Sequence, residues 1–108
     1  MLNDLEKKTP SVPLTPVPAA TVMVLRDTPS GIEVLMVQRT KKADFAGGAL
    51  LFPGGKVDED DHHVLASKLC DLSETIDNDL HALRIAGARE IFEEAGLLFA
   101  RDAKSGKL

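Results

Sequence analysis

Residues 79–95 constrain the fold most, because they carry the apolar periodicity of a long helix. Residues 73–78 offer several N-cap candidates, and Gly96 stands where a glycine commonly ends a helix. The apolar positions predicted to lie close to one stripe of this helix are Leu80, Ile85, Ala88, Phe92 and Ala95. The sequence therefore predicts one long helix in the C-terminal part of the chain.

Short apolar and β-branched runs before the helix predict strands. Residues 19–26 and 32–39 flank a Pro/Gly turn, which is the pattern of a β-hairpin. A third run, 49–52, lies between two glycine pairs, where the backbone must turn or approach something closely. We also expect a short helix over 64–72, a strand beginning at 97–100 and a turn over 101–108. These elements together predict an α/β or α+β fold.

The composition excludes several classes of protein. Thirteen Lys and Arg against 17 Asp and Glu among 108 residues give a net charge of −4, with no basic run, no Trp and no Tyr. That balance argues against nucleic acid as the main partner. No apolar run reaches the roughly 20 residues of a membrane helix, and no secretory signal is visible. The single cysteine, Cys70, excludes a disulfide within the chain and favours a reducing compartment, which we expect to be the cytoplasm.

Three glutamates mark the segment that could carry chemistry. Glu90, Glu93 and Glu94 lie at i, i+3 and i+4, so a helix places all three carboxylates on one face. Like charges at this spacing destabilise a helix, and a bound divalent cation would neutralise them. Carboxylate oxygens suit Mg²⁺ or Mn²⁺ better than zinc. A solvated acidic helix face is the alternative reading of this spacing taken alone.

The surroundings of these glutamates resemble the Nudix box. The sequence REIFEEAGL at 89–97 matches the second half of the box. Gly55, five residues and then Asp61, directly after Phe-Pro-Gly-Gly, match the first half. The resemblance covers roughly residues 19–100 and implies an α/β/α sandwich built on a mixed sheet. It also implies metal-dependent hydrolysis of a nucleoside diphosphate linked to another moiety.

The resemblance implies catalytic roles for the residues of the second half. Glu90, Glu93 and Glu94 would bind the metal ion, together with a main-chain carbonyl of the loop at Gly54. One of the three carboxylates would orient or deprotonate the attacking water. Arg89 would orient a carboxylate and offset the repulsion between them; the alternative is an exposed helix arginine.

Three further residues have expected roles around this cluster. Arg39, at the end of a predicted strand, could bind a substrate phosphate or could be an ordinary surface charge. Gly55 would lie against the substrate, by the resemblance. Asp61 would hold Arg89 across the loop, which is a structural role.

Two features depart from the usual box. The first acid is Asp61 instead of glutamate, and 27 residues, 62–88, separate it from Arg89 where the box has seven. We expect the 20 extra residues, 62–81, to form a surface excursion. His62, His63 and Cys70 lie in it, but a fourth zinc ligand is lacking, so we expect Cys70 to be a small apolar residue of a short helix.

The insertion is similar to one branch of the family, the Nudix proteins that resemble the peroxisomal coenzyme A diphosphatase. Leu35, Arg39, Gly48 and the Phe-Pro-Gly-Gly run match the spacing of a coenzyme A-type signature, whereas Asp44 reverses a charge in it. A coenzyme A-like or dinucleotide substrate is therefore one expectation.

The predicted organisation is a proline-rich extended tail over 1–18 and a partial Nudix domain over 19–108. The chain ends soon after the box, so we expect only the N-terminal half of the domain. The expected partner is a nucleotide-type small molecule, and a homo-oligomer is compatible with the sequence. Two alternatives to an active hydrolase stay open: a catalytically silent Nudix-like binding module and an inactive truncated fragment.

Overall fold

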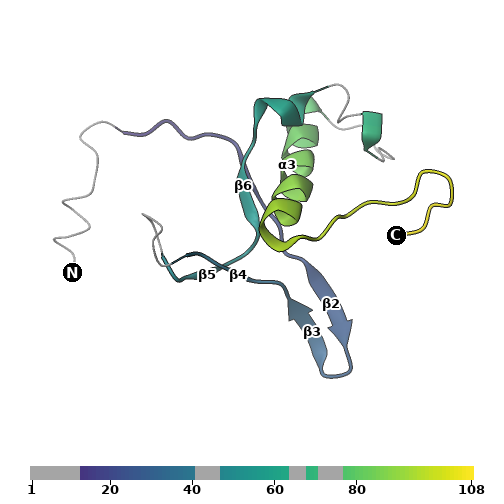
Figure 1. Ribbon diagram of the computed structural model, residues 1–108. Helices are drawn as coiled ribbons and strands as arrows, with labels where there is room; N and C mark the ends of the chain where they lie inside the picture. Colours follow the sequence, from purple (N-terminus) through teal and green to yellow (C-terminus); the bar gives the residue numbers. More distant parts are fainter. Residues whose placement is uncertain (1–12, 41–46, 64–67, 71–76) are drawn as a thin grey trace.

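The computed structural model describes residues 13–40, 47–63, 68–70 and 77–108, and its fold is α+β, which confirms the predicted class (Figure 1). The elements are β1 (Ala19–Thr21), β2 (Leu25–Thr28), β3 (Gly31–Val34), β4 (Val37–Gln38), β5 (Leu50–Leu51), β6 (Gly54–Lys56), the 3₁₀ helix η1 (Glu59–His62) and the helix α3 (Asn78–Ala95). Across these described ranges, every helix is too short or too polar to span a bilayer.

The strands pair in three antiparallel ladders, β1–β6, β2–β3 and β4–β5. The predicted hairpin is confirmed, with Leu25 opposite Val34. Each of its two predicted strands is nevertheless divided, because successive pieces of the chain pair with different partners (Figure 1). At one break, the Val22 N–H donates to the Pro53 carbonyl at 2.9 Å; at the other, the Leu35 N–H donates to the Val24 carbonyl at 2.9 Å.

Two elements between residues 53 and 63 were not predicted. The Pro-Gly-Gly run was expected to end a strand and to form a loop of the site, but Gly54 and Gly55 form β6, in which Gly55 pairs with Ala20 of β1. A Cβ at Gly54 would overlap the Ala20 carbonyl oxygen, so glycine permits this pairing. In η1, the Asp58 N–H donates to Asp61 Oδ2 at 2.8 Å.

Helix α3 begins and ends where the sequence predicted. The Asp77 carboxylate accepts a hydrogen bond from the Leu80 N–H at 2.7 Å and so caps the first turn. Gly96 ends the helix in the left-handed region with φ of 70°. The predicted strand at 97–100 is wrong, because these residues continue from α3 as an irregular segment (Figure 1). The predicted turn near the C-terminus is confirmed, since the Gly106 N–H donates to the Asp102 carbonyl.

The buried face of α3 differs from the predicted stripe. The buried residues are His81, Ala82, Ala86, Gly87 and Ile91. The predicted stripe is therefore wrong, with Phe92 52% exposed. The physical reason is a close approach between α3 and β1: a Cβ at Gly87 would lie 2.9 Å from Val22 Cγ2. A face packed this tightly selects small side chains, whatever the position of the larger apolar ones.

Parts of the expected surface excursion, 62–81, can be compared with the structure. Residues 78–81 form the first turn of α3, so they are part of the helix that carries the box; residues 78–80 are exposed as expected, whereas His81, at 8% exposure, contradicts the expected surface position. The helix continues N-terminal to the box because Asp77 provides its cap. Cys70 is exposed, which contradicts its predicted role as a small apolar residue of a short helix. Residues 1–12 of the expected tail and most of the predicted helix 64–72 lie outside the described residues.

Candidate active site

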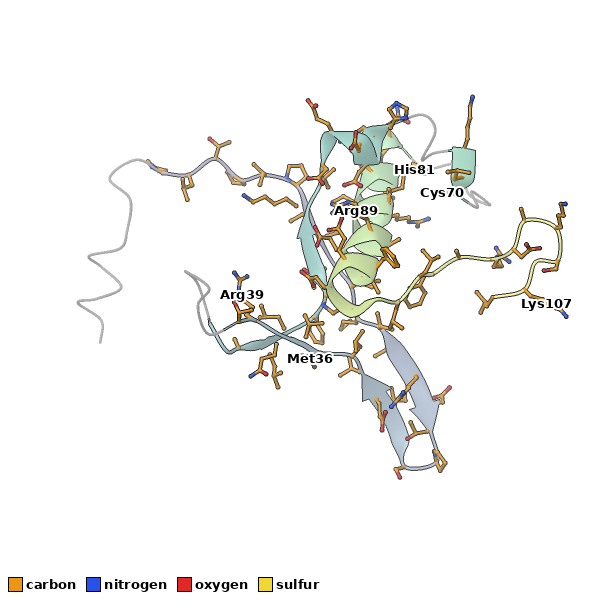
Figure 2. All side chains as sticks on the ribbon, in the orientation of Figure 1. Met36, Arg39, Cys70, His81, Arg89 and Lys107 are labelled. Carbon is orange, nitrogen blue, oxygen red and sulfur yellow. The ribbon has the colours of Figure 1, made fainter. Side chains whose placement is uncertain are left out.

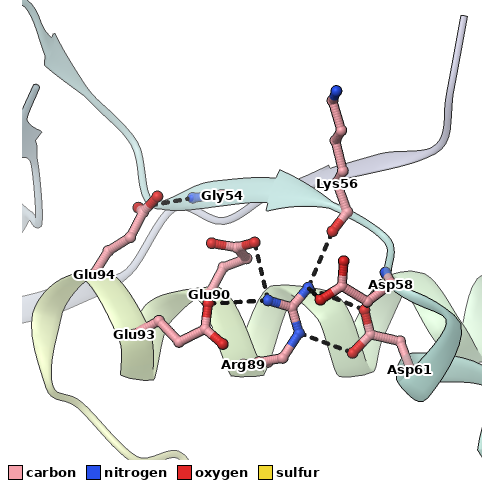
Figure 3. A network of polar contacts seen from close by, with 8 residues as sticks. All are labelled: Gly54, Lys56, Asp58, Asp61, Arg89, Glu90, Glu93 and Glu94. Carbon is pink, nitrogen blue, oxygen red and sulfur yellow. Dashed lines mark hydrogen bonds and ion pairs between the residues drawn. The ribbon is translucent and has the colours of Figure 1, made fainter. Parts of the chain in front are cut away.

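The Arg89 side chain joins α3, η1 and the end of β6 (Figure 3). Its Nε donates to Asp61 Oδ1 and its Nη2 to Asp61 Oδ2, both at 3.0 Å. Nη2 also donates to the Lys56 carbonyl at 3.0 Å. Nη1 donates to Glu90 Oε1 at 3.1 Å and to Glu93 Oε2 at 3.0 Å. A single guanidinium therefore fixes the relative positions of three elements.

Asp61 is the buried anchor of this network, at 2% exposure. Burial alone would raise the pKa of its carboxyl, but the hydrogen bonds from Arg89 and from the Asp58 N–H, with the charge of Arg89, bring that pKa below its ordinary value. The hydrogen bond to Asp61 is the main cause that raises the pKa of Arg89 above its usual range. Both groups are therefore ionised, and the predicted contact between Asp61 and Arg89 is present.

The three glutamates share one helix face but do not converge on one point. Glu90 and Glu93 both accept hydrogen bonds from Arg89, whereas Glu94 Oε2 accepts one from the Gly54 N–H at 3.3 Å (Figure 3). In the described part of the chain, no three acidic, histidine or cysteine side chains lie close enough together to hold a metal ion. Each carboxylate is instead satisfied by a donor of the protein.

The surroundings of Glu90 nonetheless fit a hard cation. A Cβ at Gly55 would overlap the Glu90 carboxylate, so the glycine allows this carboxylate to lie against β6. The Glu93 side chain is 54% exposed, and Glu94 is exposed, so both can turn on their flexible stems. Binding of one ion by all three would require Glu93 to leave Arg89 and Glu94 to leave the Gly54 N–H. The donor set suits Mg²⁺ or Mn²⁺ chemically after that rearrangement.

Arg39 and Glu94 line the same pocket, although more than fifty positions separate them in the sequence. The backbone of Arg39 is fixed beyond β4, where its N–H donates to the Ala49 carbonyl and its carbonyl accepts from the Gly48 N–H. Figure 2 places the Arg39 side chain at this end of the β4–β5 ladder, away from the β2–β3 hairpin. The structure thus brings the predicted phosphate-binding arginine near the glutamate cluster.

Some residues of the site were missed by the sequence reasoning. Asp58 Oδ2 lies 3.6 Å from Arg89 Nη2 and adds a further carboxylate to the network. The Lys56 carbonyl had no distinguishing signal, because any residue supplies one. Phe52 lines the pocket with Arg39. Its place directly before Pro53-Gly54-Gly55 could have identified it as a candidate.

Comparison with known proteins identifies a fold of the same kind. No family model matches the chain, and no curated protein matches it. Among solved structures, the chain is similar to the crystal structure of a NUDIX hydrolase from Alicyclobacillus acidocaldarius, with a TM-score of 0.70 and 36% sequence identity. The aligned region covers 89% of this chain and 45% of that chain, so this chain spans less than half the length of that relative. The similarity supports the Nudix family and a fold of the Nudix type.

Proposed function

We propose, from this similarity to a NUDIX hydrolase, that the chain acts in metal-dependent hydrolysis of a phosphoanhydride in a nucleoside diphosphate linked to another moiety. The observation that carries the proposal is the Arg89 network. It holds Glu90 and Glu93 through hydrogen bonds and places Glu90 beside the glycine strand β6, which supports the roles that the resemblance to the Nudix box implies for these acids. The network joins residues from both sides of the insertion.

The residues of the site have distinct roles in the proposed hydrolysis. Mg²⁺ or Mn²⁺, when bound, would polarise phosphoryl oxygens as a Lewis acid. Glu90, Glu93 and Glu94 would hold the ion, with the Gly54 carbonyl as a further ligand. Arg89 keeps the Glu90 carboxylate in place against Gly55. One of the carboxylates orients the attacking water and accepts its proton.

The substrate is a nucleotide-type small molecule, and Arg39 binds one of its phosphates. The pocket that Arg39 shares with Glu94 supports this role, because it places a cation near the proposed metal ligands. Gly55 lets the substrate approach β6 closely. A coenzyme A-like or dinucleotide compound fits this description.

A second candidate function is a silent module that binds a nucleotide without hydrolysing it. Arg89 donates hydrogen bonds to both Glu90 and Glu93, so these two carboxylates have partners in the absence of a metal ion. A protein that only bound nucleotides could keep this arrangement unchanged.

Titration with Mn²⁺ separates the two functions. Mn²⁺ should bind the wild type, and a double variant, Glu93→Gln with Glu94→Gln, should bind at least about tenfold more weakly. The matched control is Asp27→Asn with Glu33→Gln, which removes two exposed charges in the hairpin. Equal binding by wild type and the glutamate variant would refute the metal site. Hydrolysis of coenzyme A, NADH, ADP-ribose and nucleoside triphosphates would then be compared with Mg²⁺ and Mn²⁺.

A further inference from the structure

Strand β1 pairs with β6 along one edge, and its other edge is open among the described strands. On the paired side, the Val22 N–H donates to the Pro53 carbonyl, and the Pro18 carbonyl accepts from the Val57 N–H. Backbone N–H and C=O groups of successive residues point to opposite edges of a strand, so the even-numbered residues of this segment bond to the β6 side. The residues whose backbone groups point to the open edge are therefore Ala19, Thr21 and Met23.

We propose that this open edge pairs with the same edge of β1 in a second copy of the chain. In the antiparallel pairing, Thr21 lies opposite Thr21 of the second copy, and Ala19 lies opposite Met23. Each of these pairs exchanges both backbone hydrogen bonds, because all of their N–H and C=O groups face the open edge. The arrangement has two-fold symmetry, the commonest symmetry of protein dimers. The inference goes beyond the proposed function, since it concerns the partner of β1 and uses no residue of the glutamate cluster.

A groove of about 650 Å³ between β1 and α3 accommodates the second strand. The side chains of Ala20 and Val22 face α3, because a Cβ at Gly87 would lie 3.8 Å from Ala20 Cβ and 2.9 Å from Val22 Cγ2. A two-fold axis perpendicular to the sheet keeps the same face of both β1 strands toward the helices. Ala20 and Val22 of the second copy therefore enter the groove, where Leu83 and Ala88 of α3 line the wall.

The distribution of charge permits two copies to meet at this edge. Each chain has a net charge of −4, so two copies repel each other unless their acidic side chains lie away from the contact. Among the described residues that line the groove there is no acid, and Arg84 is the one charged residue. Glu90, Glu93 and Glu94 lie outside this lining. The acids of α3 are therefore kept out of the contact.

The apolar surface at this edge is large enough for a specific contact. Met23, Leu25 and Phe99 line the groove and are 64%, 58% and 57% exposed. Large side chains bury about 150–250 Å² each, so these three offer roughly 300–400 Å². A standard interface buries about 800 Å² on each partner, so they supply close to half of it before the backbone of β1 and the flank of α3 are counted. Pairing also converts two isolated two-stranded ladders, which are marginally stable, into one sheet.

Cysteine cross-linking tests the register of this pairing. Directly opposite Cα atoms in such a pair are about 5.5 Å apart, which a disulfide can span. All variants carry Cys70→Ser, which removes the exposed native thiol. Under mild oxidation, Thr21→Cys should form a covalent dimer at least about tenfold faster than the control Asp27→Cys, at an exposed position of the hairpin. A mixture of Ala19→Cys and Met23→Cys should give mainly the mixed dimer on non-reducing gels.

A proline at the centre of the edge tests the same contact without cross-linking. Thr21→Pro removes the N–H that points to the open edge, a position where strands tolerate proline. By symmetry the dimer loses two hydrogen bonds, so its dissociation constant in sedimentation experiments should rise at least about tenfold. The control Thr15→Pro, at an exposed residue before β1, should leave the constant unchanged.

Circular dichroism establishes that each variant is folded, and the cysteine variants decide the result if Thr21→Pro is not. A wild type that stays monomeric at every concentration would overturn the inference. So would a dimer in which Thr21→Cys cross-links no faster than Asp27→Cys, because the copies would then meet through another surface. Neither measurement involves a metal ion or a nucleotide, so the result is independent of the proposed hydrolysis.

Discussion

The Arg89 side chain offsets part of the electrostatic repulsion between the glutamates of α3. Its guanidinium contacts the carboxylates of Asp61, Glu90 and Glu93 and lies close to that of Asp58. The spacing of the acids along the helix suggested that a divalent cation would neutralise them, with a solvated acidic face as the alternative. Arg89, four residues before Glu93, offsets part of this repulsion, but its single positive charge lies among four carboxylates, so the cluster stays negative and can still attract a cation. Competition with Arg89 is the feature that any bound ion must overcome.

Removal of the buried anchor should destabilise the fold. Asp61→Ala leaves the Arg89 side chain, which is 23% exposed, without its two-point partner. We expect the free energy of unfolding to fall by about 1–3 kcal/mol, less than for a fully buried pair. Urea denaturation followed by circular dichroism measures it. The control Asp60→Ala, at the exposed neighbouring position, should change stability by less than about 0.5 kcal/mol. Equal effects at the two positions would contradict the anchoring role.

The same anchor should make the protein sensitive to acid. The folded-state pKa of Asp61 lies below its ordinary value of 3.8. Its contribution to stability is therefore complete above the unfolded-state pKa and is lost as the pH falls through the lower folded-state pKa. Between about pH 5 and about pH 2, the wild type should lose more free energy of unfolding than Asp61→Asn, which cannot titrate. Parallel losses in urea melts of the two proteins would assign the acid sensitivity to other groups.

Strand β6 serves two purposes through its two glycines. At Gly54, a Cβ would meet the backbone of Ala20 in the neighbouring strand. At Gly55, a Cβ would meet the carboxylate of Glu90. Both glycines pair with β1, but a side chain at Gly54 would disturb the β1–β6 ladder, whereas one at Gly55 would disturb the site.

Alanine substitutions should separate these purposes. Gly54→Ala should lower the free energy of unfolding by about 1–3 kcal/mol, because backbone cannot move aside cheaply. Gly55→Ala should cost less stability, since the end of the Glu90 side chain can swing away. It should, however, weaken Mn²⁺ binding, because Glu90 loses its position. Thermal melts and Mn²⁺ titrations of both variants check the pair. Unchanged Mn²⁺ binding by Gly55→Ala would show that the position of Glu90 is unimportant for the ion.

An apolar groove of about 650 Å³ runs between α3 and residues 19–25. Met23 and Phe99 line it and are 64% and 57% exposed. Among the described strands, β1 pairs on one side only, with β6. An open strand edge beside an exposed apolar groove favours association with another polypeptide. Among the described residues, by contrast, the buried apolar side chains are few and include Ala82, Ala86 and Ile91.

The groove should therefore drive self-association of the purified chain. A charge placed in it, Met23→Lys, should shift the population toward monomer without lowering the midpoint of thermal unfolding, because Met23 is exposed. Size-exclusion chromatography with light scattering at several concentrations measures the change. Leu14→Lys, at an exposed position outside the groove, should leave the wild-type distribution unchanged. A wild type that is monomeric at every concentration would contradict the prediction.

The sequence by itself determined the features that depend on near neighbours along the chain. Helix α3 follows from periodicity, with Asp77 in the range of predicted caps and Gly96 at its end. The β2–β3 hairpin follows from a Pro/Gly turn between two apolar runs. The contact between Asp61 and Arg89 could be predicted because the two halves of a known motif can be matched across an insertion.

Only the tertiary structure decided which surfaces meet. The two predicted strands are divided because their halves pair with segments distant in sequence, which no local pattern encodes. The buried face of α3 differs from the face predicted by periodicity because Gly87 approaches Val22 closely. Phe52, Arg39 and Glu94 form one pocket for the same reason: their distances are set by the packing of β4, β5 and α3. Periodicity and caps are properties of short segments, whereas burial and shared pockets are properties of pairs of segments that only folding brings together.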